Sequence, residues 1–78
     1  MDNSCSLCDI KVGERAVVER LRIHGSMRRR MLDIGLCDGT VVECVGRSPM
    51  GDPSAYLIRG AVIAIRANDS RGVIVRGI

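Results

Sequence analysis

Most of this chain consists of short runs rich in Val, Ile and other apolar residues, separated by glycine, proline and polar turn residues, which is typical of β-strands, in which residues two positions apart share a face. Between the first two such runs the period changes, because Met27, Met31 and Ile34 follow the i, i+4, i+7 spacing of one helical face. The sequence therefore predicts a mainly β fold with one short α-helix over about residues 27–34. The expected strands cover residues 15–23, 40–45, 55–59, 62–66 and 72–76, with a helical turn or tight connection at 67–71.

The predicted helix has recognisable ends. Ser26 is a residue type that caps helix N-termini through its side-chain oxygen. Gly35 comes directly after the last periodic residue, where a left-handed cap is least strained without a β-carbon. Leu36 is placed to fold back on the last helical turn, as in a Schellman motif, and the turn dipeptide Asp38-Gly39 follows. We therefore expect a helix, a glycine stop and a tight turn in direct succession.

Two details of the strand pattern carry further information. Ala16 and Val18 share one face of the first strand. Leu21 is an odd number of residues further on, so it shares this face only if the alternation shifts by one residue, which predicts a bulge near Glu19-Arg20. Two prolines and two glycines between residues 46 and 53 exclude regular structure and predict a loop there.

The composition limits the chain to one small domain. Apolar residues make up 46% of its 78 residues, yet Tyr56 is the only aromatic residue, so we expect a core of aliphatic side chains. Five to six short strands, tight turns and one helix are typical of a small SH3-like barrel, in which closure of the sheet hides its edges. Residues 1–8 are small and polar, and we expect them to form a flexible segment before a domain over residues 9–78.

The charge balance is mildly basic. Twelve Lys and Arg residues against nine Asp and Glu give a formal net charge of +3, which does not by itself indicate nucleic-acid binding. An RNA-binding barrel would also need aromatic side chains on which bases stack. No apolar run approaches the ~20 residues that a transmembrane helix needs, and the first residues lack the features of a signal peptide. We therefore expect a cytoplasmic protein with reduced thiols, no membrane insertion and no nucleic-acid partner.

A series of short motifs runs along the chain in a fixed order. They are Gly13, residues 30–36 (Arg-Met-Leu-Asp-Ile-Gly-Leu) with Gly39, residues 49–53 (Pro-Met-Gly-Asp-Pro), Gly60 with residues 63–66 (Ile-Ala-Ile-Arg), and residues 73–75 (Val-Ile-Val). No single motif is specific, but their ordered combination resembles the ferrous iron transport protein A (FeoA) family over nearly the whole chain from Val12 onward.

The resemblance implies an SH3-like barrel, no catalytic activity, and an accessory or regulatory role in bacterial ferrous iron uptake. The implied partner is the membrane ferrous iron transporter, which carries a cytosolic GTPase domain. A similar barrel follows a winged helix in metal-dependent repressors of the diphtheria-toxin-repressor type, and no winged helix is present here. The resemblance therefore favours the separate transport component.

The predicted helix and the loop after the second strand supply a candidate partner-binding surface. Arg28, Arg29 and Arg30 lie on the polar side of the helix near its N-terminus, where the helix dipole opposes positive charge. Leu32 points away from the apolar helical face, and Met50 occupies the loop tip. An apolar centre of Leu32 and Met50 ringed by arginine is typical of a protein interface. The alternative is an ordinary solvated face whose arginine stems cover apolar surface.

A metal site is the second functional hypothesis. Cys5 and Cys8 form a C-x-x-C pair, a spacing at which two thiolates can share one metal ion. Cys37 lies in a predicted turn and is the third candidate ligand, joined by His24, for Fe²⁺ or Zn²⁺. Cys44 lies on the apolar face of a strand and is expected in the core instead. A metal-binding or metal-sensing module is one interpretation of these cysteines, and an incidental C-x-x-C near the chain terminus is the other.

Overall fold

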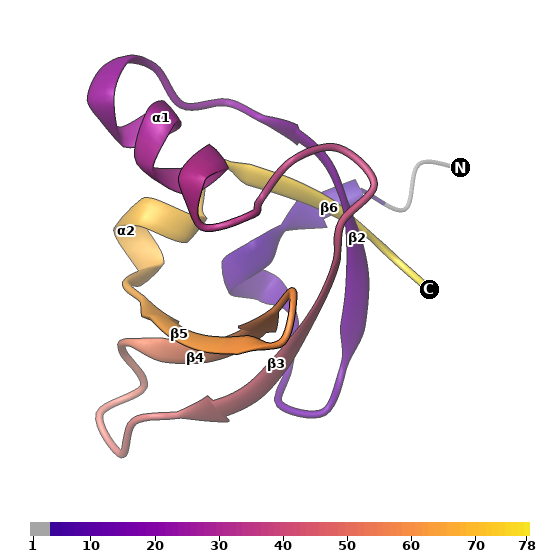
Figure 1. Ribbon diagram of the computed structural model, residues 1–78. Helices are drawn as coiled ribbons and strands as arrows, with labels where there is room; N and C mark the ends of the chain where they lie inside the picture. Colours follow the sequence, from indigo (N-terminus) through magenta and orange to yellow (C-terminus); the bar gives the residue numbers. More distant parts are fainter. Residues whose placement is uncertain (1–3) are drawn as a thin grey trace.

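Strands curl around a common core, with a short helix at one end of the molecule (Figure 1). The structure is a computed structural model that describes residues 4–78, and this range contains six antiparallel strands. The strands are β1 (Ser4–Ser6), β2 (Arg15–Leu21), β3 (Val41–Arg47), β4 (Ser54–Ile58), β5 (Ala61–Ile65) and β6 (Val73–Gly77). Their order in the sheet is β1-β6-β2-β3-β4-β5. The helical elements are η1 (Leu7–Asp9), α1 (Gly25–Asp33) and α2 (Ala67–Ser70).

The end of α1 has the predicted geometry. Gly35 has a φ of +105°. Its N–H donates to the carbonyl of Leu32, and the N–H of Leu36 donates to the carbonyl of Met31, each at 3.0 Å. These two bonds define a Schellman motif, which satisfies carbonyls at the helix end. Leu36 is fully buried, so the chain turns back under the helix as expected.

The beginning of α1 differs from the prediction. The helix starts at Gly25, so the capping residue is His24, and Ser26 lies inside the first turn. The prediction of Ser26 as the N-cap was therefore wrong, because the helix begins one residue before it, at Gly25, whose φ of +68° is a value that residues other than glycine rarely adopt. Within residues 4–78, no helix is both long and apolar enough to cross a lipid bilayer.

The sheet has the β-bulge and the buried strand faces that the sequence predicts. The pairing of β2 with β6 shifts its register between Val18 and Arg20, as the change of phase in the sequence indicated. Ala16 and Val18 are buried, and Cys44 on β3 is buried as well. These positions form one apolar layer inside the curled sheet.

Tyr56 is the exception to the expected aliphatic core. It is the largest fully buried side chain, and its hydroxyl donates a hydrogen bond to the carbonyl of Leu7 at 3.4 Å. A buried phenol needs a partner for its hydroxyl. Here the N-terminal segment supplies one, so β4 and η1 are joined across the core.

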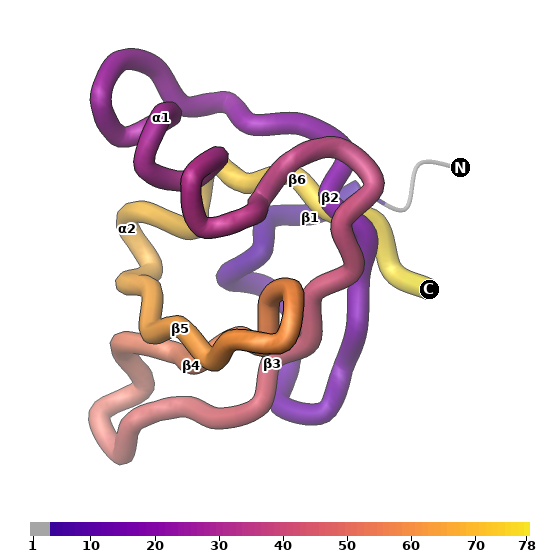
Figure 2. Tube along the Cα trace, in the orientation of Figure 1, coloured from indigo at the N-terminus to yellow at the C-terminus, as the bar shows by residue number. Residues whose placement is uncertain are grey.

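The N-terminal segment belongs to the barrel. β1 lies beside β6 (Figure 2), with Ser4 opposite Arg76 and Ser6 opposite Ile74. Leu7 follows and is fully buried. The expected boundary between a segment over residues 1–8 and a domain starting at residue 9 therefore does not coincide with an edge of the barrel, which includes residues from Ser4 onward. Of the expected segment, residues 1–3 lie outside the described residues.

The sheet curls but leaves two edges, at β1 and β5. No backbone pairing joins these two strands within the described range, and α2, which follows β5, packs against η1, which follows β1. The expectation that closure hides the strand edges was therefore wrong. A six-stranded sheet that ends in short strands can close through side-chain packing alone, without a backbone ladder between its first and last strands.

Candidate functional site

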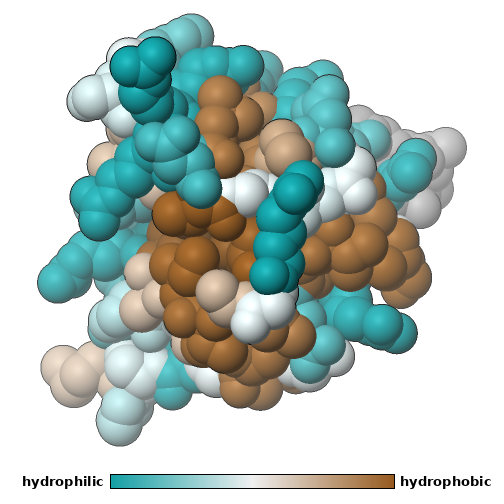
Figure 3. Space-filling model, viewed as in Figure 1, coloured by the Kyte–Doolittle hydropathy of each residue, from teal (hydrophilic) through white to brown (hydrophobic). Residues whose placement is uncertain are grey.

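An apolar groove separates the end of α1 from the hairpin of β4 and β5. Its volume is about 480 Å³, which is within the usual range for ligand sites. In the space-filling view, apolar side chains gather between α1 and this hairpin (Figure 3). The groove is lined by the apolar residues Leu32, Ile34, Ile58, Ala61 and Ile63, together with Asp33, Gly35, Cys37 and Arg59.

Two other hollows, each of about 570 Å³, are less suited to hold an apolar group. One lies beside β1, and its only large apolar side chain is Ile78. The other lies between the start of α1, α2 and β6, and its apolar residues Ile23, Met27 and Ile74 are interspersed with the polar residues Ser6, Arg22, Asn68, Asp69 and Arg71. The groove between α1 and β5 is therefore the better candidate for binding a partner or ligand.

The first wall of the groove depends on Gly35. A β-carbon at this position would lie 2.9 Å from Cδ of Arg59 and 3.3 Å from Cγ2 of Ile58. The glycine that ends α1 therefore also allows the end of the helix to approach the hairpin closely. Leu32, one turn earlier, is 40% exposed and lies at the rim.

The second wall is the β4–β5 hairpin. Arg59 and Gly60 form its two-residue turn, with φ angles of +50° and +84°. Positive φ at both positions is the signature of a type I′ turn, whose twist matches that of the strands. Ala61 and Ile63 pair with inward-facing residues of β4, yet Ala61 is exposed and Ile63 is only partly buried. The inner face of the barrel is therefore uncovered at the start of β5.

A thiol and a guanidinium lie at the mouth of the groove. Sγ of Cys37 is 3.4 Å from Oγ1 of Thr40, and Nη2 of Arg59 donates to the same sulfur at 3.2 Å. The hydrogen bond with Thr40, and then the hydrogen bond and charge of Arg59, lower the pKa of Cys37 below the usual value of a thiol. The polar rim thus combines a positive charge with an ionisable sulfur.

The residues predicted to bind a partner lie in two different places. Arg28, Arg29 and Arg30 are exposed on α1, and Leu32 lines the groove beside them. Met50 is 91% exposed on the loop between β3 and β4, which Figure 1 shows at the opposite end of the molecule from α1. The structure therefore does not form the expected shared apolar centre of Leu32 and Met50. The binding role of all five residues stays a prediction.

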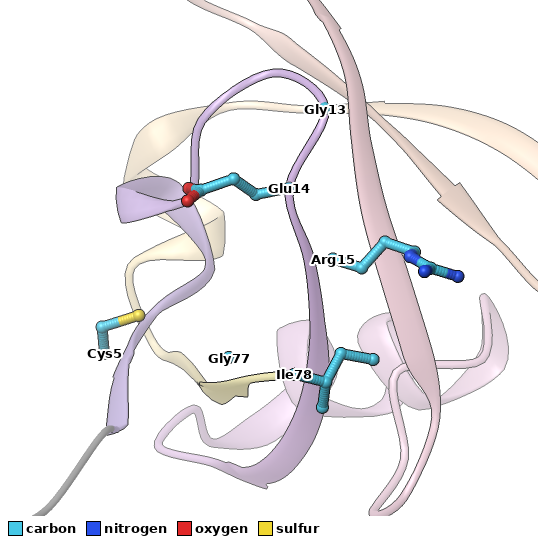
Figure 4. A pocket seen from close by; sticks show the side chains of 6 residues that line it. All are labelled: Cys5, Gly13, Glu14, Arg15, Gly77 and Ile78. Atoms are coloured by element: carbon cyan, nitrogen blue, oxygen red, sulfur yellow. The ribbon is translucent and has the colours of Figure 1, made fainter.

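The three predicted metal ligands are not brought together either. Cys5 and Glu14 line the hollow next to β1, and Figure 4 shows the Arg15 side chain pointing away from Cys5. Cys37, in contrast, lines the groove between α1 and the β4–β5 hairpin. Burial, followed by the charges of Asp9 and Glu14, raises the pKa of Cys5. Among residues 4–78, no three His, Cys, Asp or Glu side chains are arranged to hold a metal ion. The metal-binding role of Cys5, Cys8 and Cys37 stays a prediction.

The sequence did not identify the hairpin side of the groove. Ile58, Arg59, Ala61 and Ile63 were assigned only to barrel strands and their turn. One signal was available, because residues 61–65 contain no polar side chain. An antiparallel strand with one face in water normally alternates, so a short edge strand without polar residues is unusual.

Known proteins provide independent information on the family. The family model of the FeoA domain matches residues 5–77. A Fe(2+) transport protein A/Fe(2+) transporter FeoB fusion protein from Porphyromonas gingivalis is 30% identical over 64 residues, which cover 82% of this chain and 8% of that protein. The chain thus corresponds to less than a tenth of the length of this curated relative.

Solved structures agree with the sequence match. The FeoA-like protein from Clostridium acetobutylicum has a TM-score of 0.90 and 26% identity, and the alignment covers 100% of this chain and 91% of that chain. FeoA from Stenotrophomonas maltophilia, described as a prokaryotic SH3 domain protein in complex with zinc, has a TM-score of 0.80 and 26% identity, with 90% and 87% covered. The predicted SH3-like fold and the resemblance seen in the sequence are both confirmed. This chain belongs to the FeoA domain family.

Proposed function

We propose that this chain is an accessory, regulatory component of ferrous iron uptake that binds the cytosolic region of the membrane ferrous iron transporter. The observation that carries the proposal is the relative from Porphyromonas gingivalis, in which Fe(2+) transport protein A and the Fe(2+) transporter FeoB form one polypeptide. Two modules joined in one chain are held at a high effective concentration, which suits partners that act in contact. The chain's contribution is binding, and ferrous iron is the cargo of the transporter.

The groove supplies the chemistry that such a contact needs. Leu32, Ile34 and Ile63 are incompletely buried and lie together along it. Covering one such side chain stabilises a complex by roughly 1.5–3 kcal/mol at most. The charged residues that line the groove are Asp33 and Arg59, and the exposed arginines 28–30 precede Leu32 on the same helix. This excess of positive charge favours a partner surface with acidic residues. We therefore place the contact at the groove and α1.

The test is a titration of the purified chain with the cytosolic region of the ferrous iron transporter from the same organism, followed by calorimetry and amide-shift mapping. We expect saturable binding, with shifts concentrated at α1 and the β4–β5 hairpin. Leu32→Glu places a charge in the groove and should weaken binding at least about tenfold. Arg29→Glu reverses one charge of the rim and should weaken binding less, with an effect that diminishes as salt increases.

Two further variants locate the contact. Val12→Glu is the matched control, because Val12 is an exposed apolar residue of the turn before β2, which lies at the other end of the molecule from α1 (Figure 1). It should bind like the wild type. Met50→Glu tests whether the contact extends to the β3–β4 loop. Absence of binding by the wild type would overturn the proposed function, whereas equal binding by the Leu32 and Val12 variants would move the contact away from the groove.

A further inference from the structure

The backbone of β5 has one side without hydrogen-bond partners. The two-residue turn at Arg59-Gly60 makes Ile58 and Ala61 the first hydrogen-bonded pair of the hairpin, and such pairs then occur at every second residue. The N–H and C=O groups of Val62 and Ala64 therefore point away from β4. No hydrogen bond to these groups is present within residues 4–78.

The same edge borders the apolar groove. A strand added beside β5 would lie about 4.8 Å from it and project alternate side chains to opposite faces. One set would enter the groove next to Ile63 and Ala61, towards Leu32 on the opposite wall. The other set would lie beside Val62, which is 63% exposed. The unpaired backbone groups of β5 and the exposed apolar side chains of the groove therefore lie along the same strand edge.

The charges at the two ends of β5 indicate what kind of strand fits. Arg59 comes just before the strand and Arg66 directly after it, and both are exposed. Between them, residues 61–65 carry no charge. A complementary segment is therefore apolar in the middle, with an acidic residue at each end. At ~3.3 Å per residue, the two acidic residues should be roughly six or seven positions apart.

These charges also disfavour a second copy of the chain as the occupant. Antiparallel pairing of two β5 strands would place Arg59 of each copy near Arg66 of the other. Like charges that face each other across strands destabilise the pairing. An acidic segment of a different protein has no such conflict.

We propose that β5 is a strand-addition site, at which an extended segment of the transporter's cytosolic region, apolar in the middle and acidic at both ends, pairs with Val62 and Ala64. The inference rests on the proposed function and adds the mode of recognition and the chemistry of the bound segment. Main-chain hydrogen bonds provide affinity in this mode, and the groove provides selectivity for alternate side chains.

Amide hydrogen exchange tests the backbone contacts directly. In the free chain, the amides of Val62 and Ala64 should exchange rapidly, and the amide of Ile63, which donates to β4, should be protected. Saturation with the transporter's cytosolic region should slow exchange at Val62 and Ala64 at least about tenfold. Overlapping ten-residue peptides from that region then identify the bound segment, which should contain the apolar centre and the two acidic ends.

A proline variant with a matched control tests the same contact by affinity. Ala64→Pro removes an N–H that β4 does not use, and proline is tolerated on the free side of an edge strand. Ala64→Val keeps the N–H and adds apolar bulk at the same place. We expect Ala64→Pro to raise the Kd at least about tenfold, and Ala64→Val to change it less than about threefold. Amide spectra of both variants establish that they fold.

The possible outcomes separate the two proposals. If the cytosolic region binds but the amides of Val62 and Ala64 stay unprotected, strand addition is wrong and the proposed function stands. If the wild-type chain does not bind that region at all, the proposed function fails first. If protection increases with the chain's own concentration and sedimentation shows a dimer, the occupant is a second copy and the assignment to the transporter is wrong. Should Ala64→Pro not fold, hydrogen exchange on the wild type still decides.

Discussion

The two edges of the sheet end in different ways. At one edge, β1 has three residues, two of them serines, and the buried Leu7 follows directly. The Ser4 hydroxyl donates to the Glu19 carboxylate, and the Ser6 hydroxyl donates to the carbonyl of Arg71 at 2.8 Å. At the other edge, β5 has five residues and no polar side chain.

This difference shows which edge is available to another chain. Short strands and polar side chains protect a sheet edge from pairing, whereas a longer apolar edge favours it. The N-terminal edge is in addition fixed by Leu7, which lies in the core under Tyr56. The chain therefore protects one edge and leaves the other next to an apolar groove. Differences in stability and reactivity between the two edges test this comparison.

The largest effect is expected from Leu7→Ala. Leu7 is fully buried, so its truncation should lower the free energy of unfolding by about 3 kcal/mol. The matched variant at the other edge is Val62→Ala, which should change stability by less than about 0.5 kcal/mol because Val62 is largely exposed. Urea denaturation of both variants provides the measurement. Equal losses would show that the two edges are anchored alike.

A smaller loss is expected from Gly35→Ala. The substitution places a β-carbon at a positive φ and against the stem of Arg59, which should cost about 2 kcal/mol. Gly46→Ala is the control, because its φ is ordinary and the nearest atom to a new β-carbon is the Ala55 β-carbon at 4.0 Å. The control should change stability by less than about 1 kcal/mol. If both variants unfold at the same urea concentration, close contact between α1 and the hairpin is not needed for stability.

The smallest effect concerns the two thiols near the two edges. At pH 8 the lowered pKa of Cys37 gives it a larger thiolate fraction than Cys5, whose pKa is raised. Because the thiolate is the nucleophile, iodoacetamide should modify Cys37 faster than Cys5. The difference should shrink as the pH rises above both pKa values, and Arg59→Gln should slow Cys37 alone. Peptide mapping by mass spectrometry measures both rates, and faster modification of Cys5 would reverse the comparison.

The parts of the fold that depend on local chemistry could be predicted from the sequence. The helical period, the glycine stop at Gly35 and the bulge at Glu19 each depend on a few neighbouring residues, and all are present in the structure. The strand β1 could not be predicted in this way. Three small or polar residues carry no strand signal, and their pairing partner, β6, lies about 70 positions later in the chain.

The candidate site was predicted on one side only. Leu32 was identified because it leaves the apolar stripe of the helix, which is a local property. The other wall depends on how closely the β4–β5 turn approaches Gly35, and this contact is set by tertiary packing. The expectation that Leu32 and Met50 lie close together was not met for the same reason. The sequence does not reveal the direction in which the loop that carries Met50 leaves the sheet.

Tyr56 gives this protein a built-in optical probe. The chain has one tyrosine and no tryptophan, and the tyrosine ring lies where β4 meets the N-terminal turn. Burial raises the pKa of Tyr56, so tyrosinate absorbance should appear at a higher pH in the folded chain than in the unfolded chain. Ultraviolet spectra of the unlabelled protein therefore report on one chromophore and on the docking of residues 7–9 against it.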